Sequence, residues 1–394
     1  MSIEHVVILG IAAIPFIYYF LAIFGTLKFF THSKRRPPDQ SVFTPPVSCL
    51  KPIRGLAEDE YENYASFCRQ NYPEYEILFC VDEDDPGLPV LKRLMQEYPH
   101  VQIRLVFGPD HVAINDKVAR LDRLSKEARY DVWVLTDGDV RVTPDYLRSV
   151  VAPLQNPKIG GVTCFYSATT ETNFTEKLQE LGMMCDFYPG ILVAWLLDGV
   201  KFGFGQTIVT TRARVQGFGG FQAIENRPAD DLLVCRFIAE AGFEVELLPY
   251  VVRTTPDFHS TKDLLYKRLR WMTVMRHMRP WGHLGLIFTF GLPWSLLAFL
   301  IVPSAATALF YLGGYFLCRV LMTWLVGVYG LKQSGLWTKM ILIPIWDATA
   351  FFIWLASFTC RSIRWRGIDY TLRDGMLTLA TPERARSTSP QPES

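Results

Sequence analysis

Three groups of carboxylates along the chain have spacings that suit metal binding or proton transfer. In chain order they begin at Asp82, at Asp137 and at Asp230. The second group is Asp137-Gly138-Asp139, and the third is Asp230-Asp231. Hard divalent cations bind carboxylate and phosphate oxygens, so two aspartates one residue apart can hold Mg²⁺ or Mn²⁺ against a diphosphate. A carboxylate beside a sugar can also accept the proton of an attacking hydroxyl. The pattern predicts metal binding at Asp137 and Asp139 and leaves the general-base role to one of the Asp230-Asp231 pair.

The first gathering runs from Asp82 to Asp85 and is followed by a proline. Each of the three has an ordinary structural explanation as well, because carboxylates favour helix N-termini and Asp-Gly pairs favour turns. Position separates the two interpretations for the second group. It directly follows an apolar strand at residues 132–135, beside another predicted strand that ends in carboxylates, and ligands of open parallel sheets bind beyond such strand ends.

Basic and aromatic residues precede the C-terminal apolar region, in the order Lys267-Arg268-Leu269-Arg270-Trp271. Basic residues at this place can be simple topology signals. A planar, permanently charged guanidinium also suits a leaving diphosphate, and an indole suits stacking on a sugar or lipid. The functional interpretation therefore gives Arg270 and Trp271 to the catalytic site.

The elements that must position these residues follow an α/β pattern between about residues 47 and 250. Short β-branched runs predict strands at 47–52, 76–81, 101–107 and 132–136, and intervening patterns predict helices at 58–70, 86–98, 115–128 and 144–153. Alternation of this kind is typical of a largely parallel sheet with right-handed crossovers. The fold class is thus α/β, with a catalytic domain expected over residues 45–280.

An almost uninterrupted apolar stretch at the N-terminus predicts a transmembrane anchor over residues 5–31. Lys34, Arg35 and Arg36 follow it, and basic residues stay on the cytosolic side, so the catalytic domain is expected in the cytosol. A second apolar stretch, residues 187–197, is too short to span, and we expect it to lie at the bilayer surface and help admit a lipid acceptor.

The C-terminal membrane region, residues 284–360, contains two to three apolar segments. Three crossings would place Arg361 and Arg364 outside, against the same rule that orients the anchor. Asp347 interrupts the third segment, and a carboxylate in lipid must face protein or a wet cavity, so a re-entrant or interfacial segment is favoured. Residues 381–394 lack periodicity and are expected to be disordered.

Composition limits the class of partner. The chain has 394 residues with 40 basic and 39 acidic side chains, so no overall field favours nucleic acid. Its eight cysteines are scattered without metal-ligand spacing and are expected to be reduced.

Together these motifs resemble the family-2-like glycosyltransferases, and most closely the ceramide glucosyltransferase family and its bacterial lipid-modifying relatives such as hopanoid glycosyltransferases. The order of three spaced aspartates, a Q/R-x-x-R-W motif and membrane segments behind one anchor is shared across most of the chain. The stretch Leu50-Lys51-Pro52-Ile53-Arg54-Gly55 is similar to the family's L-K-P-x-x-G, and Asn115-Asp116-Lys117 to its N-x-K. Lys267 departs from the pattern, because glutamine or arginine is expected there.

The resemblance implies a nucleotide-diphospho-sugar transferase (GT-A type) fold and a role for each matched residue. Asp82, Lys117 and Asp137 would contact the nucleotide-sugar, Asp137 with Asp139 would hold the metal, and Asp231 would be the general base. The implied reaction is an inverting, metal-dependent transfer of a hexosyl unit from a UDP-sugar to the hydroxyl of a ceramide-like or hopanoid-like membrane lipid.

The resemblance also implies an integral membrane protein of sphingolipid-type metabolism, with the bacterial inner membrane as the expected location. Two alternatives stay open at this point. A processive polysaccharide synthase shares the aspartates and the R-W motif but usually has more membrane helices. A non-enzymatic lipid-binding or transport-associated membrane protein would not require carboxylates at strand ends.

Overall fold

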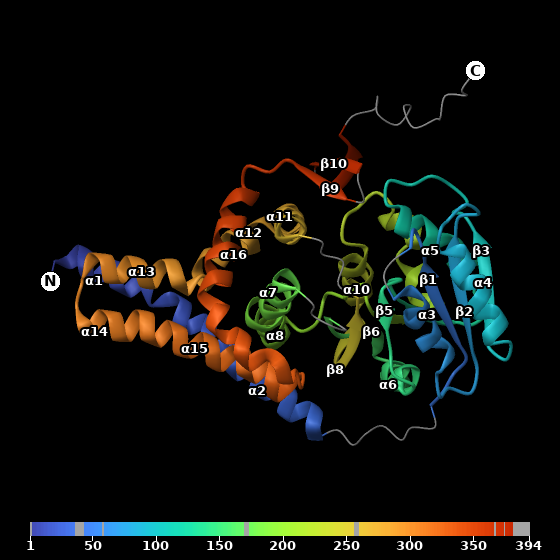
Figure 1. Cartoon of the computed structure of the whole chain (residues 1–394), viewed down its shortest axis with the longest axis horizontal. Helices are drawn as coiled ribbons and strands as arrows, with labels where there is room; N and C mark the ends of the chain where they lie inside the picture. The colour runs from blue at the N-terminus through green and yellow to red at the C-terminus, as the bar shows by residue number, and fades with distance from the viewer. Residues whose placement is uncertain are drawn as a thin grey trace.

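The structure is a computed structural model that describes residues 2–35, 43–56, 59–168, 173–255, 260–365, 368–373 and 375–380. Figure 1 shows two parts: an α/β domain built on one large sheet, and a group of apolar helices contributed by both the N-terminal and C-terminal regions. The helices α7 and α8 lie between the two parts. The predicted tail at 381–394 lies outside the described residues.

The sheet has eight strands in the order β3-β2-β1-β4-β7-β6-β8-β5. Strands β1 to β4 pair in parallel, whereas β7 runs antiparallel to both of its neighbours. The strands are β1 (Val47–Pro52), β2 (Tyr75–Val81), β3 (Gln102–Phe107), β4 (Val132–Leu135), β5 (Val140–Arg141), β6 (Ile159–Ala168), β7 (Ile208–Thr211) and β8 (Glu244–Thr254). The predicted α/β class is confirmed.

Helices cover both faces of the sheet, which explains why its central strands are apolar throughout. All six residues of β1 and all four of β4 are buried. The connecting helices are α3 (Glu60–Cys68), α4 (Leu88–Glu97), α5 (Asp116–Glu127), α6 (Tyr146–Val151) with η1 (Ala152–Gln155), α9 (Arg212–Gly217), η3 (Phe221–Ile224) and α10 (Asp230–Glu240). The first four α-helices fall within the ranges that the sequence predicts.

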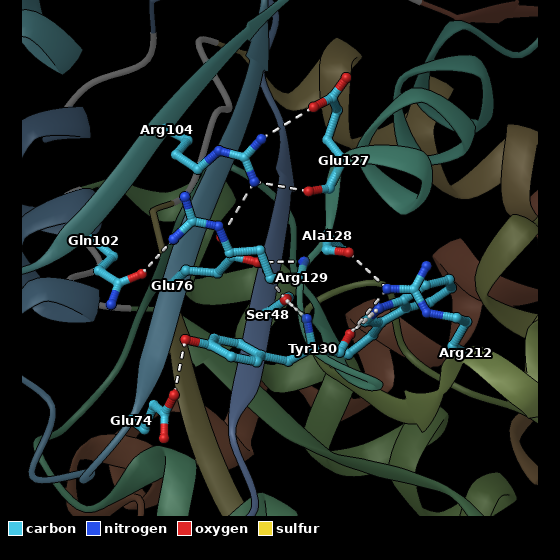
Figure 2. A network of polar contacts seen from close by, with 11 residues as sticks. Ser48, Glu74, Glu76, Gln102, Arg104, Glu127, Ala128, Arg129, Tyr130 and Arg212 are labelled. Atoms are coloured by element: carbon cyan, nitrogen blue, oxygen red, sulfur yellow. Dashed lines mark hydrogen bonds and ion pairs between the residues drawn. The ribbon is translucent and has the colours of Figure 1, made fainter.

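A buried carboxylate fixes the end of α5 that lies away from the site, as Figure 2 shows. Glu76, at 0% exposure, accepts hydrogen bonds from Ser48 Oγ and the Arg129 backbone N–H, each at 2.7 Å. Arg104 pairs with the same carboxylate at 3.4 Å and donates to the Glu127 carbonyl at 2.7 Å. Because these contacts hold the C-terminal end of α5 beside the starts of β1 and β2, its N-terminal end lies toward their carboxyl edge.

Four helices are long and apolar enough to cross a membrane, and a bent pair makes a possible fifth. They are Ile3–His32, Phe174–Asp198, Ala305–Gly330 and Gly335–Ser357, with Pro280–Thr289 and Gly291–Ile301 as the bent pair. Their component elements are α1 (Ile3–Ala12), α2 (Ile14–Arg35), α7 (Phe174–Gly182), η2 (Met183–Phe187), α8 (Tyr188–Asp198), α12 (Pro280–Gly285), η4 (Leu286–Thr289), α13 (Gly291–Ile301), α14 (Ala305–Thr307), η5 (Ala308–Gly313), α15 (Gly314–Thr323), η6 (Trp324–Gly330), η7 (Ser334–Leu342) and α16 (Ile343–Ser357).

The apolar stretch at 187–197 is therefore part of a longer helix. It begins at the end of the π-helical turn η2 and continues the helix that starts at Phe174. This continuous helix is 25 residues long, so the expectation that the stretch is too short to span rests on a boundary that the structure does not have.

Asp347 on α16 faces protein. Its carboxylate pairs with the Arg319 guanidinium, whose Nε lies 2.9 Å from Oδ2, and accepts a hydrogen bond from Tyr315 Oη at 2.7 Å. Arg319 and Asp347 are each only 4% exposed. A carboxylate removed from water is stabilised only when it is paired and hydrogen-bonded, which this arrangement provides while it joins α15 to α16.

A small C-terminal sheet packs on the α/β domain. Its strands are β9 (Ser362–Trp365), β10 (Ile368–Arg373) and β11 (Met376–Leu379), in antiparallel order. The Leu377 N–H donates to the Asn226 carbonyl at 2.8 Å, and Tyr370 and Leu372 belong to an apolar cluster that includes Ile114. The end of the chain beyond the apolar helices thus touches the catalytic domain.

Candidate active site

The predicted site residues lie at the carboxyl edge of the parallel strands. In the register of the sheet Leu50 of β1 pairs with Leu135 of β4, and Pro52 of β1 pairs with Cys80 of β2. Three neighbouring strands therefore end together. Asp82 follows β2 and Asp137 follows β4, so both emerge at this edge.

Lys117 joins two of the predicted carboxylate groups. Its Nζ lies 2.7 Å from Asp137 Oδ1 and 3.0 Å from Asp230 Oδ2. The Asn115 side chain caps α5 by accepting from the Val118 N–H, which places Lys117 in the first turn. Burial opposes the charged form of this lysine, but the surrounding carboxylates outweigh it and raise the pKa of Lys117. The lysine is thus a fixed positive charge between the second and third groups.

Asp231 is oriented by two backbone donors. Its Oδ2 accepts from the Gly205 N–H at 3.0 Å, and its Oδ1 accepts from the Leu232 N–H at 2.8 Å. The Gly205 carbonyl in turn accepts from the Asp137 N–H at 3.2 Å. The Gly205 backbone therefore connects the predicted base to the predicted metal-binding motif.

Gly205 can form this connection because it has no side chain. A Cβ at this position would lie 2.9 Å from Asp137 Oδ2 and 3.0 Å from Lys117 Nζ. The residue before the Asp230-Asp231 pair, Ala229, takes a left-handed φ of 57°, a conformation that costs an alanine about 1 kcal/mol. Both features indicate that the backbone here is shaped by the site.

Burial and neighbouring charge shift the predicted base, Asp231, and one predicted metal ligand, Asp139, in the same direction. Burial, with a further contribution from Asp230, raises the pKa of Asp231 to about 6. Burial, with a further contribution from Asp137, raises the pKa of Asp139 to about 6. Both groups are ionised at neutral pH and hold a proton more readily than an ordinary aspartate.

Asp82 lies at the same edge but in a separate charge group. Its Oδ2 is 2.5 Å from the Arg120 guanidinium, which also pairs with Asp116 at 3.0 Å. Arg54 lies 3.3 Å from Asp116. Arg120 stands one helical turn after Lys117 on α5, so consecutive turns of this helix serve the first and the second carboxylate groups.

Lys51, a residue to which the sequence assigns no role, supports the Asp137 turn. Its Nζ donates to Thr136 Oγ1 at 2.8 Å and to the Asp137 carbonyl at 3.0 Å, and it lies 3.8 Å from the centre of the Phe67 ring. The side chain is 0% exposed, and burial lowers the pKa of Lys51 to about 7. A lysine inside an otherwise apolar buried strand was the available sequence signal.

The helix α11 (Thr261–Met278) carries the basic motif. Lys267 lies close enough to Asp139 to offset part of the rise in the pKa of that carboxyl, so the residue that departs from the family pattern still adds positive charge to the site. Arg270, one turn later on the same face, is half-buried. Trp271 packs against Phe187, with ring centres 5.9 Å apart.

Arg268 and Tyr166 connect α11 with the carboxylates, although the sequence gives no role to either. Arg268 is 8% exposed, lies 5.1 Å from the Trp271 ring and 4.7 Å from the Trp346 ring, and donates through Nε to Gln179 at 3.0 Å. Tyr166 lies within electrostatic range of Arg268, and Asp139 and Asp231 both act on its hydroxyl. The aspartates of the second and third groups therefore share a neighbourhood on the α11 side of the sheet.

No group of three or more His, Cys, Asp or Glu side chains within the described ranges is arranged to hold a metal unaided. Protein-bound Mg²⁺ commonly has one or two carboxylate ligands and takes the others from phosphates and water. Asp137 and Asp139 fit such a site, because a single residue separates them and Asp137 makes the ionisation of Asp139 more costly, a cost that a cation would offset.

Comparison with solved structures agrees with the fold. A mannosyltransferase from Pyrobaculum calidifontis, solved in complex with GDP-mannose and Mn²⁺, aligns with a TM-score of 0.56 and 18% identity over 88% of this chain and 99% of that one. At this identity the likeness concerns the fold alone, and it shows that the α/β domain has the expected GT-A type fold.

Comparison with curated sequences gives relatives along most of the chain. Ceramide glucosyltransferase 1 of Caenorhabditis elegans is 24% identical over 86% of this chain and 73% of its own length. Ceramide glucosyltransferase 3 of the same organism is 24% identical over 93% and 82%, respectively. The model of the family described as glycosyl transferase family 21 matches residues 7–378, and the chain therefore belongs to that family.

Proposed function

We propose that this protein transfers a hexosyl unit from a UDP-sugar to the hydroxyl of a membrane lipid, in a single inverting displacement. The relatives named ceramide glucosyltransferases support a sphingolipid-like acceptor, and a hopanoid-like lipid has the same kind of hydroxyl. The observation that carries the proposal is the junction at Lys117, where the metal-binding motif and the Asp230-Asp231 pair meet beside the apolar helices.

Asp231 is the proposed general base. The lipid hydroxyl oxygen attacks the anomeric carbon, the bond from that carbon to the diphosphate oxygen breaks, and the hydroxyl proton passes to Asp231. The Gly205 and Leu232 N–H groups fix the orientation of this carboxylate. Its pKa of about 6 leaves it ionised at neutral pH and more basic than an ordinary aspartate.

The leaving diphosphate gathers negative charge, and several side chains are placed to balance it. Asp137 and Asp139 would hold a Mg²⁺ or Mn²⁺ ion, which supplies positive charge to the diphosphate oxygens when bound. Lys267, which acts on Asp139, and Arg270, one turn later on α11, are proposed to supply further positive charge. Asp82, with Arg120, stands two strands away from Asp137 and is the proposed contact for the nucleoside.

The contacts between elements support a proposed membrane placement. Strands β6 and β7 are hydrogen-bonded neighbours, so the helix Phe174–Asp198 between them starts and ends on one side. The C-terminal sheet touches the catalytic domain, so the chain crosses an even number of times between α11 and β9. We assign those two crossings to the bent pair and to Ala305–Gly330, and we place Gly335–Ser357 at the membrane surface. In Figure 1, α16 runs across α13 and α14 rather than alongside them.

With the N-terminal helix as a further crossing, the C-terminal end of α2 and the segment at 361–364 share the catalytic side in this arrangement. The positive-inside rule makes that side the cytosol. Labelling of intact cells with a membrane-impermeant maleimide tests this arrangement. Ser304→Cys should be labelled from outside, whereas native Cys360 should react only after lysis. Labelling of Cys360 in intact cells would overturn the assignment.

A reconstitution experiment tests the activity. The full chain in lipid vesicles, given UDP-glucose, Mn²⁺ and ceramide, is expected to form a glycosylated lipid detectable by mass spectrometry, with an inverted anomeric centre by NMR. Parallel reactions test UDP-N-acetylglucosamine as an alternative donor and a hopanoid alcohol as an alternative acceptor. Elongation into a polymer, or the absence of any lipid product with all of these pairs, would contradict the proposal.

A further inference from the structure

An open groove runs between α11 and α16, away from the carboxylates. Its volume is about 530 Å³. Leu265, Tyr266 and Leu269 line it from α11, and Phe352, Ile353 and Ala356 line it from α16. The walls are therefore almost entirely apolar, and their two largest side chains, Tyr266 and Phe352, are 59% and 66% exposed. A large exposed apolar surface of this kind usually marks a place where something binds.

The outward face of α16 continues this apolar surface. Ile341, Ile345 and Phe352 are between 52% and 71% exposed and recur along one side of the helical segment Gly335–Ser357. A helix that lies at the membrane surface buries such a face among the acyl chains. The groove thus opens toward lipid rather than toward water.

The rim of the groove has the composition of a headgroup boundary. Lys262 is the one charged residue among those that line it, and its Nζ lies 5.6 Å from the centre of the Tyr266 ring. Tyrosine concentrates at membrane interfaces, and lysine extends its ammonium toward the headgroups while its methylenes stay in apolar surroundings. A lipid chain in the groove would have its polar end near this rim.

The walls are held in place by contacts outside the groove. Arg276 of α11 donates to the carbonyls of Phe358 and Cys360 just beyond α16. Arg268, on another face of α11, lies between Trp271 and Trp346, which belongs to α16. The same helix presents Lys267 to Asp139, so a lipid held against one face of α11 lies one helix width from the catalytic carboxylates.

We propose that this groove, which we call the α11/α16 groove, binds an acyl chain of the acceptor lipid and brings its hydroxyl around α11 to the site. The inference rests on the proposed lipid acceptor. It adds a chain-length requirement that the catalytic residues alone do not impose, because each buried methylene contributes to binding.

The test fills the groove in the full-length protein. Ala356→Trp is assayed with UDP-glucose, Mn²⁺ and ceramides that carry either a six-carbon or a sixteen-carbon acyl chain. Leu317→Trp is the matched control, because Leu317 lies on α15 outside the groove and is 67% exposed. The KM for the long-chain ceramide is expected to rise roughly tenfold in Ala356→Trp alone, with the short-chain KM unchanged.

A second variant and a photolabelling measurement test the groove independently of Ala356→Trp. Phe352→Ser removes an exposed wall without a steric clash and should raise the long-chain KM in the same way. A photoactivatable sixteen-carbon ceramide should label peptides of α11 or α16, in competition with unlabelled ceramide. Equal KM changes for both chain lengths, or labelling by photoactivatable phosphatidylcholine that ceramide does not compete away, would overturn the groove assignment.

Failure of the proposed function gives a different result. If the wild-type protein glycosylates no lipid, the transfer reaction itself is refuted, whereas normal transfer by the wild type with unaltered chain-length dependence in both variants refutes only the groove.

Discussion

Substitution of Asp231 by asparagine isolates the proton-transfer role from the structural one. Asparagine is nearly isosteric, and its side-chain oxygen can still accept the Gly205 N–H that lies 3.0 Å from Asp231 Oδ2. The turn that supports Asp137 is therefore retained, while the capacity to accept a proton is lost. Positioned general bases contribute about 10²- to 10⁴-fold in rate, so kcat should fall by that amount with the UDP-sugar affinity little changed.

The pH dependence sharpens the same prediction. Burial and Asp230 favour the protonated form of Asp231 and raise its pKa to about 6, so the base is ionised above that pH and loses activity as the pH falls through it. Between pH 7 and pH 5 the ionised fraction falls about tenfold, and kcat should follow it. Saturating Mn²⁺ is expected to keep Asp139 ionised across this range. The fall of kcat at low pH can then be assigned to protonation of Asp231.

The assay is transfer of radiolabelled sugar to lipid, with UDP-sugar binding measured by calorimetry on the same preparations. In the Asp231→Asn protein the residual rate should show no acidic limb. Asp230→Asn is the control, since it removes one partner of Lys117 and should weaken donor binding while an acidic limb remains, moved to lower pH because Asp230 no longer opposes the ionisation of Asp231. An unchanged limb in Asp231→Asn, or turnover within a few-fold of wild type, would remove Asp231 from the base role.

Three further substitutions test other parts of the structure. Asp139→Asn should raise the Mn²⁺ concentration needed for half-maximal transfer by at least tenfold, and excess chelator should stop the wild-type reaction; full activity in chelator would refute the metal site. Gly205→Ala places a Cβ 2.9 Å from a carboxylate oxygen of the metal motif, so donor binding should weaken, whereas Gly217→Ala has open space and should not matter. Glu76→Ala leaves buried donors unpaired and should destabilise the fold by about 3 kcal/mol, seen as a lower Tm, whereas Glu97→Ala on the surface should leave the Tm unchanged.

The positions of the first four parallel strands could be predicted because burial on both faces makes their sequences continuous apolar runs. β1 covers the predicted residues 47–52 in full, and the other three differ from prediction by one residue at one end. The order of the later strands could not be predicted in this way. β7 inserts antiparallel between β4 and β6, a long-range pairing with no signature in its four residues.

The carboxylates could be selected from sequence, but the cations that organise them could not. Lys117 was expected to contact nucleotide, and in the structure it also pairs with Asp137 and Asp230. Arg120 pairs with both Asp82 and Asp116. Such pairings depend on how consecutive turns of α5 approach different strand ends, and that geometry exists only after the sheet has formed.

The C-terminal membrane region shows where hydropathy stops being sufficient. Each of its apolar segments is long enough to cross, so length alone gives three crossings and conflicts with the basic residues that follow. Two observations support the proposed arrangement of two crossings: the Arg319–Asp347 pair makes α16 compatible with a partly buried position against α15, and the C-terminal sheet touches the α/β domain. A helix whose two flanking segments must lie on one side cannot be counted as a crossing, however apolar it is. The same reasoning supports the proposal that Phe174–Asp198 does not cross, because it connects β6 and β7, which are neighbours in one sheet.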